Sequence, residues 1–259
     1  MYTTVELKRE GRLACLLLNR PASMNAMDAV MMGELADVFE ELKRDPSVQV
    51  VLIQGAGRAF SAGGDIKAML DPDNGMDIEK VMVDLSRLAK ALYTLPQITI
   101  AVVHGAAAGL GCSVVLGCDM IIAEENSKLA MNFIGIGLVP DGAGHFFLKE
   151  RVGVPQAKKL IWSGKVMNGS EALAKGLIDE VTPEGKAAEY GAAYAQQLLA
   201  SPIVAMMASK KILHAQKIAE LENVSKMESD AQAAMRKTAD HLEGIQAFVE
   251  KRKPVFTGK

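Results

Sequence analysis

The sequence predicts an α/β fold in which an α/β part of about 150 residues is followed by a helical part. Two short apolar runs, residues 48–53 and 98–103, are typical of buried strands. Apolar residues recur at helical spacing between such runs, and after Pro140 nearly every segment has a helical pattern. A strand–helix–strand order implies parallel strands joined by right-handed crossovers.

Strands and helices alternate through the first part of the chain. A turn at Glu10-Gly11 would join the first two strands as a hairpin. Asp28 is a suitable N-cap for the first helix, and Asp45-Pro46 ends it because proline does not continue a helix. In order, we predict strands over 5–7, 14–18, 48–53, 98–103 and 120–123, and helices over 28–42, 77–95 and 107–116.

The remaining chain is predicted to be mostly helical. The last predicted helix is polar over much of its surface but also carries Met227, Met235 and Phe248. Such a pattern suits a helix that packs on its own core or on another subunit. The predicted helices span 154–162, 170–175, 187–199, 202–219 and 223–248.

Bulk composition excludes several classes of protein. The 259 residues carry a net charge of -2, which gives no general attraction to nucleic acid or to an anionic membrane. The three cysteines indicate neither a disulfide framework nor a zinc site. We expect no secretory signal peptide, because the first residues lack a charged stretch followed by an apolar one. We expect no membrane span, because no apolar run approaches the ~20 residues needed to cross a bilayer. A reducing cytoplasm is the simplest compartment.

Two glycine-rich turns carry the main chemical signal. The segment 59–67 (AFSAGGDIK) follows one predicted strand, and 104–111 (HGAAAGLG) follows another. Two small-residue turns at strand ends can each direct a backbone N–H into one cleft, as an oxyanion hole requires. Taken singly, each turn is equally compatible with close packing alone.

Several segments together resemble the enoyl-CoA hydratase/isomerase (crotonase) superfamily. They are LNRPASMNAM, VLIQGAGRAF, FSAGGDIKAM, HGAAAGLGCSVVLGCDMIIA and FVEKRKPVF, and they span nearly the whole chain. The resemblance implies a spiral of ββα units as a core, here residues 1–195. It also implies a helical C-terminal region, residues 196–259, that covers the active site and forms a homotrimer or a dimer of trimers.

The resemblance implies an acyl-CoA thioester as substrate, with no metal and no cofactor beyond the coenzyme A of the substrate. By motif position, the backbone N–H groups of Gly64 and Leu110 would hold the thioester oxygen. Lys67 and the terminal cluster Lys251-Arg252-Lys253 with Lys259 are candidates for contact with phosphate, or are simply solvated. The residues predicted to line the substrate path are Met24, Ala26, Ala62, Gly64, Asp65, Ile66, Lys67, Leu110 and Phe133.

The two glutamates of classical hydratases are missing. Ser113 stands where the first would follow the glycine turn, and Phe133 stands at the second position. Instead, the segment ending in Pro140-Asp141-Gly142 resembles that of family members that shift a double bond with one acid. One carboxylate suffices for such a shift, since it can act as base and then as acid. In an apolar pocket beside Phe133 and Leu138, the pKa of Asp141 should be raised by desolvation.

Three functions therefore remain open at the level of sequence. An enoyl-CoA isomerase that uses Asp141 is the leading hypothesis. A hydratase or another thioester lyase is the second, and a crotonase-type protein that binds coenzyme A or a protein partner without catalysis is the third. Pro-Asp-Gly is also a common turn sequence. His145 is a weaker catalytic candidate, His104 is expected to hold backbone, and Glu124 and Glu125 are expected at the surface.

Overall fold

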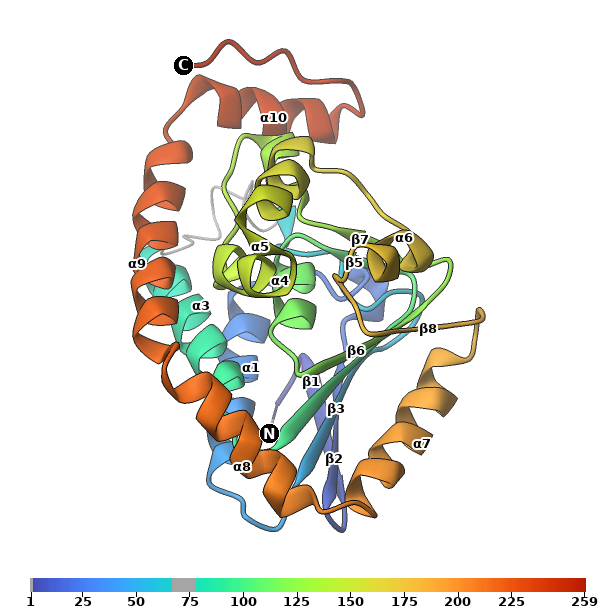
Figure 1. The fold of residues 1–259 in the computed structure, drawn as a ribbon. Helices are drawn as coiled ribbons and strands as arrows, with labels where there is room; N and C mark the ends of the chain where they lie inside the picture. Colours follow the sequence, from blue (N-terminus) through green and yellow to red (C-terminus); the bar gives the residue numbers. More distant parts are fainter. Residues whose placement is uncertain (1, 67–77) are drawn as a thin grey trace.

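A six-stranded sheet forms the centre of the computed structural model, which describes residues 2–66 and 78–259. The spatial order is β1 (Val5–Glu10), β2 (Leu13–Leu18), β3 (Val50–Gly55), β4 (Ile98–Val103), β6 (Met120–Glu124) and β8 (Glu180–Thr182). Among the described strands of this sheet, β1 and β2 pair antiparallel, as the predicted hairpin, and the other neighbours pair parallel. The α/β class and the parallel crossovers are therefore confirmed (Figure 1).

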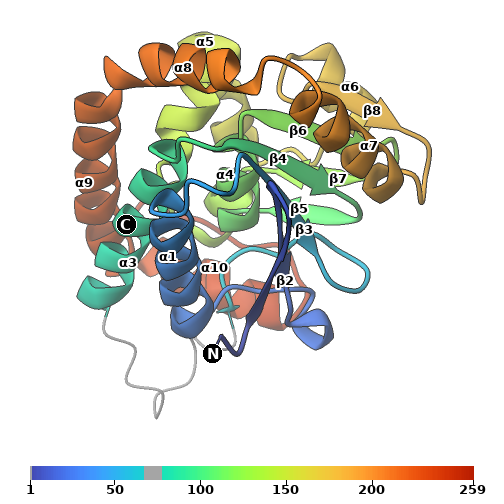
Figure 2. The ribbon, with the colours of Figure 1, turned by 90° about the horizontal axis from the view of Figure 1, so that it is seen from below.

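Helices cover both faces of this sheet. Helices α1 (Ala29–Lys43) and α3 (Ile78–Tyr93) lie on one face, and α7 (Ala187–Leu199) lies on the other (Figures 1 and 2). Asp28 is the N-cap of α1, as predicted, because its side chain accepts a hydrogen bond from Met31 N at 2.9 Å. The larger core lies on the α1–α3 side, which is also the side of the two glycine turns.

A second, two-stranded sheet corrects one prediction. Residues 107–116 are not one helix, because Ala106–Ala108 forms strand β5 and pairs parallel with β7 (Lys128–Ala130). Ser61 also bridges to Ala107. Alanine favours helices by intrinsic propensity, but these pairings with two distant segments outweigh that preference. Helix α4 (Leu110–Leu116) begins only after Gly109.

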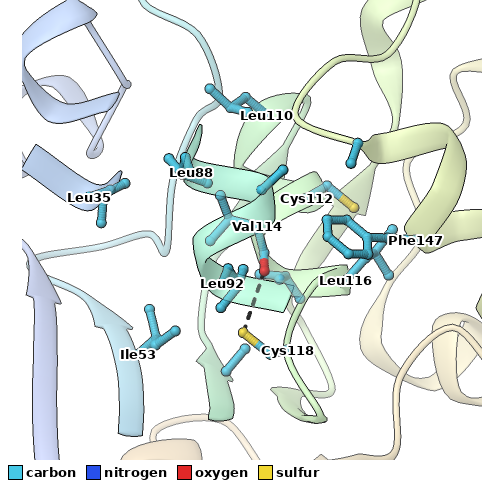
Figure 3. Close-up of a cluster of buried hydrophobic side chains, with 14 of the residues drawn as sticks. Leu35, Ile53, Leu88, Leu92, Leu110, Cys112, Val114, Leu116, Cys118 and Phe147 are labelled. Atoms are coloured by element: carbon cyan, nitrogen blue, oxygen red, sulfur yellow. Dashed lines mark hydrogen bonds between the residues drawn. The ribbon is translucent and has the colours of Figure 1, made fainter. Parts of the chain in front are cut away.

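Helix α4 is buried along its whole length, which fixes its N-terminus in the core. Its neighbours include Leu88 and Leu92 from α3 and Phe147 from α5 (Gly144–Ser163) (Figure 3). A Cβ added at Gly117, just after α4, would lie 2.8 Å from Leu92 Cδ2 and 3.1 Å from Phe147. A larger residue at this position would have to displace these two side chains, so glycine allows the close packing of α4 against α3 and α5.

The C-terminal part is helical, as predicted, but the prediction of one helix over 223–248 is wrong. The chain forms α8 (Ile203–Ala215), α9 (Ile218–Met235) and α10 (Ala239–Val249) instead of one helix over 223–248. The predicted helix is interrupted at Thr238, which is the N-cap of α10: its hydroxyl accepts a hydrogen bond from His241 N at 3.1 Å. Figure 1 shows α9 along one side of the molecule and α10 turned across one end. The predicted division at residue 195 falls within α7 and stays a prediction.

Two short elements complete the described fold. They are the 3-10 helices η1 (Pro21–Ser23) and η3 (Asn132–Ile136), while α6 (Gly169–Ala174) precedes β8. Helix α10 packs closely on η3: a Cβ added at Gly244 would lie 2.7 Å from Ile136 Cα. His241 Nδ1 also lies 2.8 Å from Ile136 O. In the described residues, no helix has the length and apolar character that a bilayer span requires.

Candidate active site

The two glycine-rich turns lie against each other. Ser61 N donates to Ala106 O at 2.9 Å, and Ala108 N donates to Ser61 O at 3.1 Å. Gly63 has φ +96°, and a Cβ there would lie 2.6 Å from Ala108 O. A side chain at this position would force the turns apart, so glycine is required by both conformation and contact. The predicted meeting of the turns is thus present in the structure.

Two amides are left without acceptors where the turns meet. The neighbours of Gly64 pair with Met27: Met27 N donates to Gly63 O at 2.7 Å, and Asp65 N donates to Met27 O at 3.0 Å. Leu110 is the first residue of α4, so its N–H has no carbonyl one turn earlier in the helix. Within residues 2–66 and 78–259, neither the Gly64 nor the Leu110 amide donates a hydrogen bond.

A cavity of about 180 Å³ opens at these amides. Most of its walls are apolar, from α1, α3 and the η3 segment, and Arg236 and Phe248 also contribute. Pockets for whole ligands measure roughly 300–1,000 Å³. The smaller volume of this cavity suits part of a substrate, such as an acyl group. The predicted site residues that line it are Ala62, Gly64, Asp65, Ile66, Leu110, Phe133 and Asp141.

Two predicted substrate-binding residues, Met24 and Ala26, are not among the described residues that line the cavity. Met24 supports the first turn through its backbone, since Ala62 N donates to Met24 O at 2.9 Å. Ala26 is buried, and its carbonyl accepts from Arg20, whose Nη1 also lies 3.0 Å from Asp65 Oδ2. Lys67 lies outside the described residues. In the terminal basic cluster, Arg252 is paired with Glu243 and Glu250.

Asp141 is buried, with 7% of its surface exposed, and it faces the cavity. Its Oδ2 accepts from Gln232 Nε2 at 3.3 Å. Its Oδ1 has no hydrogen-bond partner among the described residues. Burial, and then the nearby carboxylate of Glu228, raise the pKa of Asp141 from 3.8 to about 7. The sequence-based expectation of a pKa raised by desolvation is confirmed.

The backbone around Asp141 is held from two sides. Ser113 Oγ donates to Asp141 O at 2.8 Å, so the residue at the position of the missing first glutamate supports the aspartate. The next two residues, Gly142 and Ala143, have φ values of +62° and +60°. Glu228 on α9 stabilises this strained turn by accepting from Ala143 N at 2.8 Å. The side chain of Asp141 therefore stands on a fixed loop.

A row of polar residues on α9 is the part of the site that the sequence analysis missed. Glu228, Gln232 and Arg236 are spaced four residues apart and so lie on one face of the helix. Glu228 is 3% exposed and Gln232 is fully buried, and Gln232 Nε2 also donates to Val139 O at 2.6 Å. The four-residue spacing was a signal in the sequence, but the surrounding polar residues indicated a solvated surface.

The other polar candidates have structural contacts. His145 Nδ1 lies 2.8 Å from Glu228 Oε1, and His145 is not among the residues that line the cavity. His104 Nε2 lies 2.9 Å from Gly57 O, so it holds backbone as expected. The expectation that Glu124 lies at the surface is wrong, because it is 7% exposed and accepts from Gly185 N at 2.8 Å. A loop that folds back over β6 buries it.

Comparison with known proteins assigns the chain to a family. The family model "Enoyl-CoA hydratase/isomerase" matches residues 8–259. A Bacillus subtilis protein, "Putative enoyl-CoA hydratase/isomerase YhaR", is 45% identical over 97% of this chain and 98% of its own length. The 1,2-epoxyphenylacetyl-CoA isomerase of Escherichia coli is 32% identical over 96% of this chain and 97% of its own.

Solved structures agree with this assignment. The crystal structure of an enoyl-CoA hydratase from Mycobacterium avium subsp. paratuberculosis superimposes with a TM-score of 0.90 and 32% sequence identity. The match covers 99% of this chain and 100% of that one, which confirms the crotonase-type fold. Enzymes of this family act on acyl-CoA thioesters. With unpaired amides at two joined turns and a family match over nearly its full length, the chain belongs to the enoyl-CoA hydratase/isomerase family.

Proposed function

We propose that the protein is an enoyl-CoA isomerase that shifts a carbon–carbon double bond along the acyl chain. The observation that carries this proposal is a buried carboxylate, Asp141, whose Oδ1 has no partner among the described residues and which lines the same cavity as Gly64 and Leu110. A carboxylate that must both accept and return a proton needs one free oxygen and a pKa near the working pH.

In the proposed mechanism, the Gly64 and Leu110 amides bind the thioester oxygen of a 3-enoyl-CoA. Ionised Asp141 removes a proton from C2, and the negative charge spreads onto the thioester oxygen as a dienolate. The two amides stabilise that charge more strongly than they stabilise the neutral thioester, which lowers the barrier. Protonated Asp141 then delivers its proton to C4, which gives the 2-enoyl-CoA. The reverse direction uses the same steps.

The composition of the cavity favours this reaction over hydration. Syn-addition of water requires groups that position the water and supply a proton at C2. Ser113 and Phe133 stand where the resemblance places the hydratase glutamates, and neither is a carboxylate. Among the described residues that line the cavity, the only acidic side chain besides Asp141 is Asp65, and Arg20 pairs with it at 3.0 Å.

The test is Asp141→Asn, assayed for double-bond migration on 3-hexenoyl-CoA and for hydration of crotonyl-CoA. We expect migration by the variant to be about 10²–10⁴-fold slower in kcat, the usual contribution of a general base. The matched control is Asp230→Asn, an exposed aspartate on α9, which should retain normal activity. Coenzyme A thioesters should still raise the Tm of both variants.

Other outcomes would identify the alternatives. Full activity of Asp141→Asn would remove Asp141 from the mechanism. Appreciable hydration of crotonyl-CoA by the wild type, without migration on the 3-enoyl substrate, would favour a hydratase. A Tm increase with thioesters in the absence of any turnover would favour a protein that only binds coenzyme A derivatives.

A further inference from the structure

We propose that Arg236 makes the acyl cavity selective for an enoyl-CoA whose acyl chain carries a second carboxylate. This deepens the proposed function by naming the substrate class of the same cavity. The observation behind it is a cation that lines an otherwise mainly apolar acyl cavity and has no hydrogen-bonded partner among the described residues.

Arg236 is placed by the end of α9. It is the C-cap residue, about one helical turn beyond Gln232, which itself hydrogen-bonds Asp141 Oδ2. Arg236 lines the same cavity as Asp141 and Leu110. Its Nε is fully buried and lacks an acceptor, and within residues 2–66 and 78–259 no carboxylate forms a salt bridge with it.

An unpaired guanidinium in such a place is costly. The free-energy cost of removing a cation from water is offset in proteins by a carboxylate, which can accept two parallel N–H hydrogen bonds from arginine. Burial lowers the pKa of Arg236, and the charge of Asp141 opposes that shift. Asp141 attracts Arg236 from a distance, but its Oδ2 is bonded to Gln232. The guanidinium therefore borders the cavity with no hydrogen-bonded partner among the described residues, and a ligand carboxylate would supply one.

Stabilisation of the C-terminus of α9 by a positive charge does not account for Arg236. The next residue, Lys237, is exposed, as is Lys226 near the middle of α9. Lys237 supplies positive charge at the C-terminal end of α9, and neither lysine is among the described residues that line the cavity. A helix C-terminus is favoured by positive charge, but an exposed lysine provides that at no desolvation cost. A partly buried arginine that lines the acyl cavity, with its Nε buried, fits recognition of an anion better.

Binding of saturated thioesters tests the proposal. We would measure the Kd values of hexanedioyl-CoA and hexanoyl-CoA for the full-length protein by isothermal titration calorimetry. The two ligands have the same chain length and differ in the distal carboxylate. We expect the wild type to bind hexanedioyl-CoA at least about tenfold more tightly, as a charge-assisted bidentate contact would provide.

Substitution of Arg236 should remove this preference. In Arg236→Gln, hexanedioyl-CoA should bind no more tightly than hexanoyl-CoA, since the desolvated carboxylate then lacks a cation. Arg236→Lys should keep part of the preference, because lysine retains the charge but not the bidentate fork. Lys237→Gln, which removes the adjacent exposed charge, should keep the full preference. A variant that does not fold would be recognised by its circular dichroism, and the wild-type ratio still decides the question.

Two results would overturn the proposal. One is a wild-type protein that binds hexanoyl-CoA as tightly as hexanedioyl-CoA or more tightly. The other is an Arg236→Gln variant that keeps the wild-type preference. Neither ligand contains a double bond, so the outcome is independent of whether the protein is an isomerase. Failure of double-bond migration would leave the binding preference standing, and loss of the preference would leave the role of Asp141 standing.

Discussion

The carboxyl group of Asp141 makes few of the contacts that an aspartate in a simple turn makes. Such an aspartate hydrogen-bonds nearby backbone N–H groups, which lowers its pKa. Here Oδ2 accepts one bond from a distant glutamine and Oδ1 has no partner among the described residues. The pKa is raised instead, to about 7, mainly by burial. These contacts favour a proton-transfer role over the turn-capping alternative left open by the sequence.

The pKa of Asp141 predicts how catalysis depends on pH. The first proton transfer needs ionised Asp141, so kcat/KM for a 3-enoyl-CoA should rise with pH by up to tenfold per pH unit below about 7 and level off above it. Glu228 raises this pKa through its charge, so Glu228→Gln should move the inflection to lower pH.

The control for this shift is Glu222→Gln, an exposed glutamate on the same helix that pairs with Lys90. Its pH profile should match that of the wild type. An inflection that stays in place or moves upward in Glu228→Gln would contradict the electrostatic influence assigned to Glu228. Because the measured quantity is the position of the inflection, a modest loss of folded protein would not imitate the effect.

At the scale of elements, the N-terminus of α4 is the critical feature. It presents the Leu110 amide because Gly109 (φ +50°) ends β5 and the whole helix is packed in the core. Proline is tolerated at the first position of a helix, where its missing N–H breaks no helical bond. Leu110→Pro therefore removes the proposed oxyanion donor while it leaves the helix possible.

We expect Leu110→Pro to lower kcat about 10²–10³-fold relative to Leu110→Ala, the usual effect of removing one oxyanion donor. Leu110→Ala is the matched control, because it loses the buried side chain but keeps the amide. The measurement is steady-state kinetics on 3-hexenoyl-CoA, with near-UV circular dichroism to compare folding. Equal activities of the two variants would show that the Leu110 amide does not bind the reacting oxygen.

Helix α9 shows why element-level prediction was incomplete. The sequence predicted a helix that packs on its own core or on another subunit, but not that its polar residues Glu228 and Gln232 are buried against the loop that carries Asp141. The alanines of β5 suggested a helix, yet they form a strand between Ser61 and β7. In both cases a partner far along the chain outweighs the local pattern.

At the scale of the molecule, α8 leaves apolar side chains uncovered. Val204, Ile212 and Leu213 are 70%, 70% and 73% exposed, and Trp162 at the end of α5 is 68% exposed. Uncovered apolar residues of this size commonly mark interfaces between subunits. The family resemblance implies a homotrimer or a dimer of trimers, and we expect the exposed apolar residues of α8 to form part of the contact between subunits.

Light scattering after gel filtration tests the assembly. The wild type should elute with three or six times the mass of one chain. Ile212→Lys combined with Leu213→Lys should shift it towards the monomer, because charge at a buried apolar contact costs several kcal/mol. Leu173→Lys on α6 is the control, since Leu173 is 41% exposed on a different helix. A monomeric wild type, or an unchanged mass in the double variant, would refute this surface as the interface.

The sequence by itself determined the α/β order, the two glycine turns and, through the family resemblance, the candidate residues Gly64, Leu110 and Asp141. These features are local: strand and turn patterns depend on near neighbours, and a motif keeps its spacing along the chain. Only the tertiary structure decided which groups surround Asp141. Gln232 lies 91 residues from it, and Glu228 is 85 residues from the Ala143 amide that it binds. No periodicity in the sequence encodes which buried polar groups meet, because that depends on how α9 packs across the finished core.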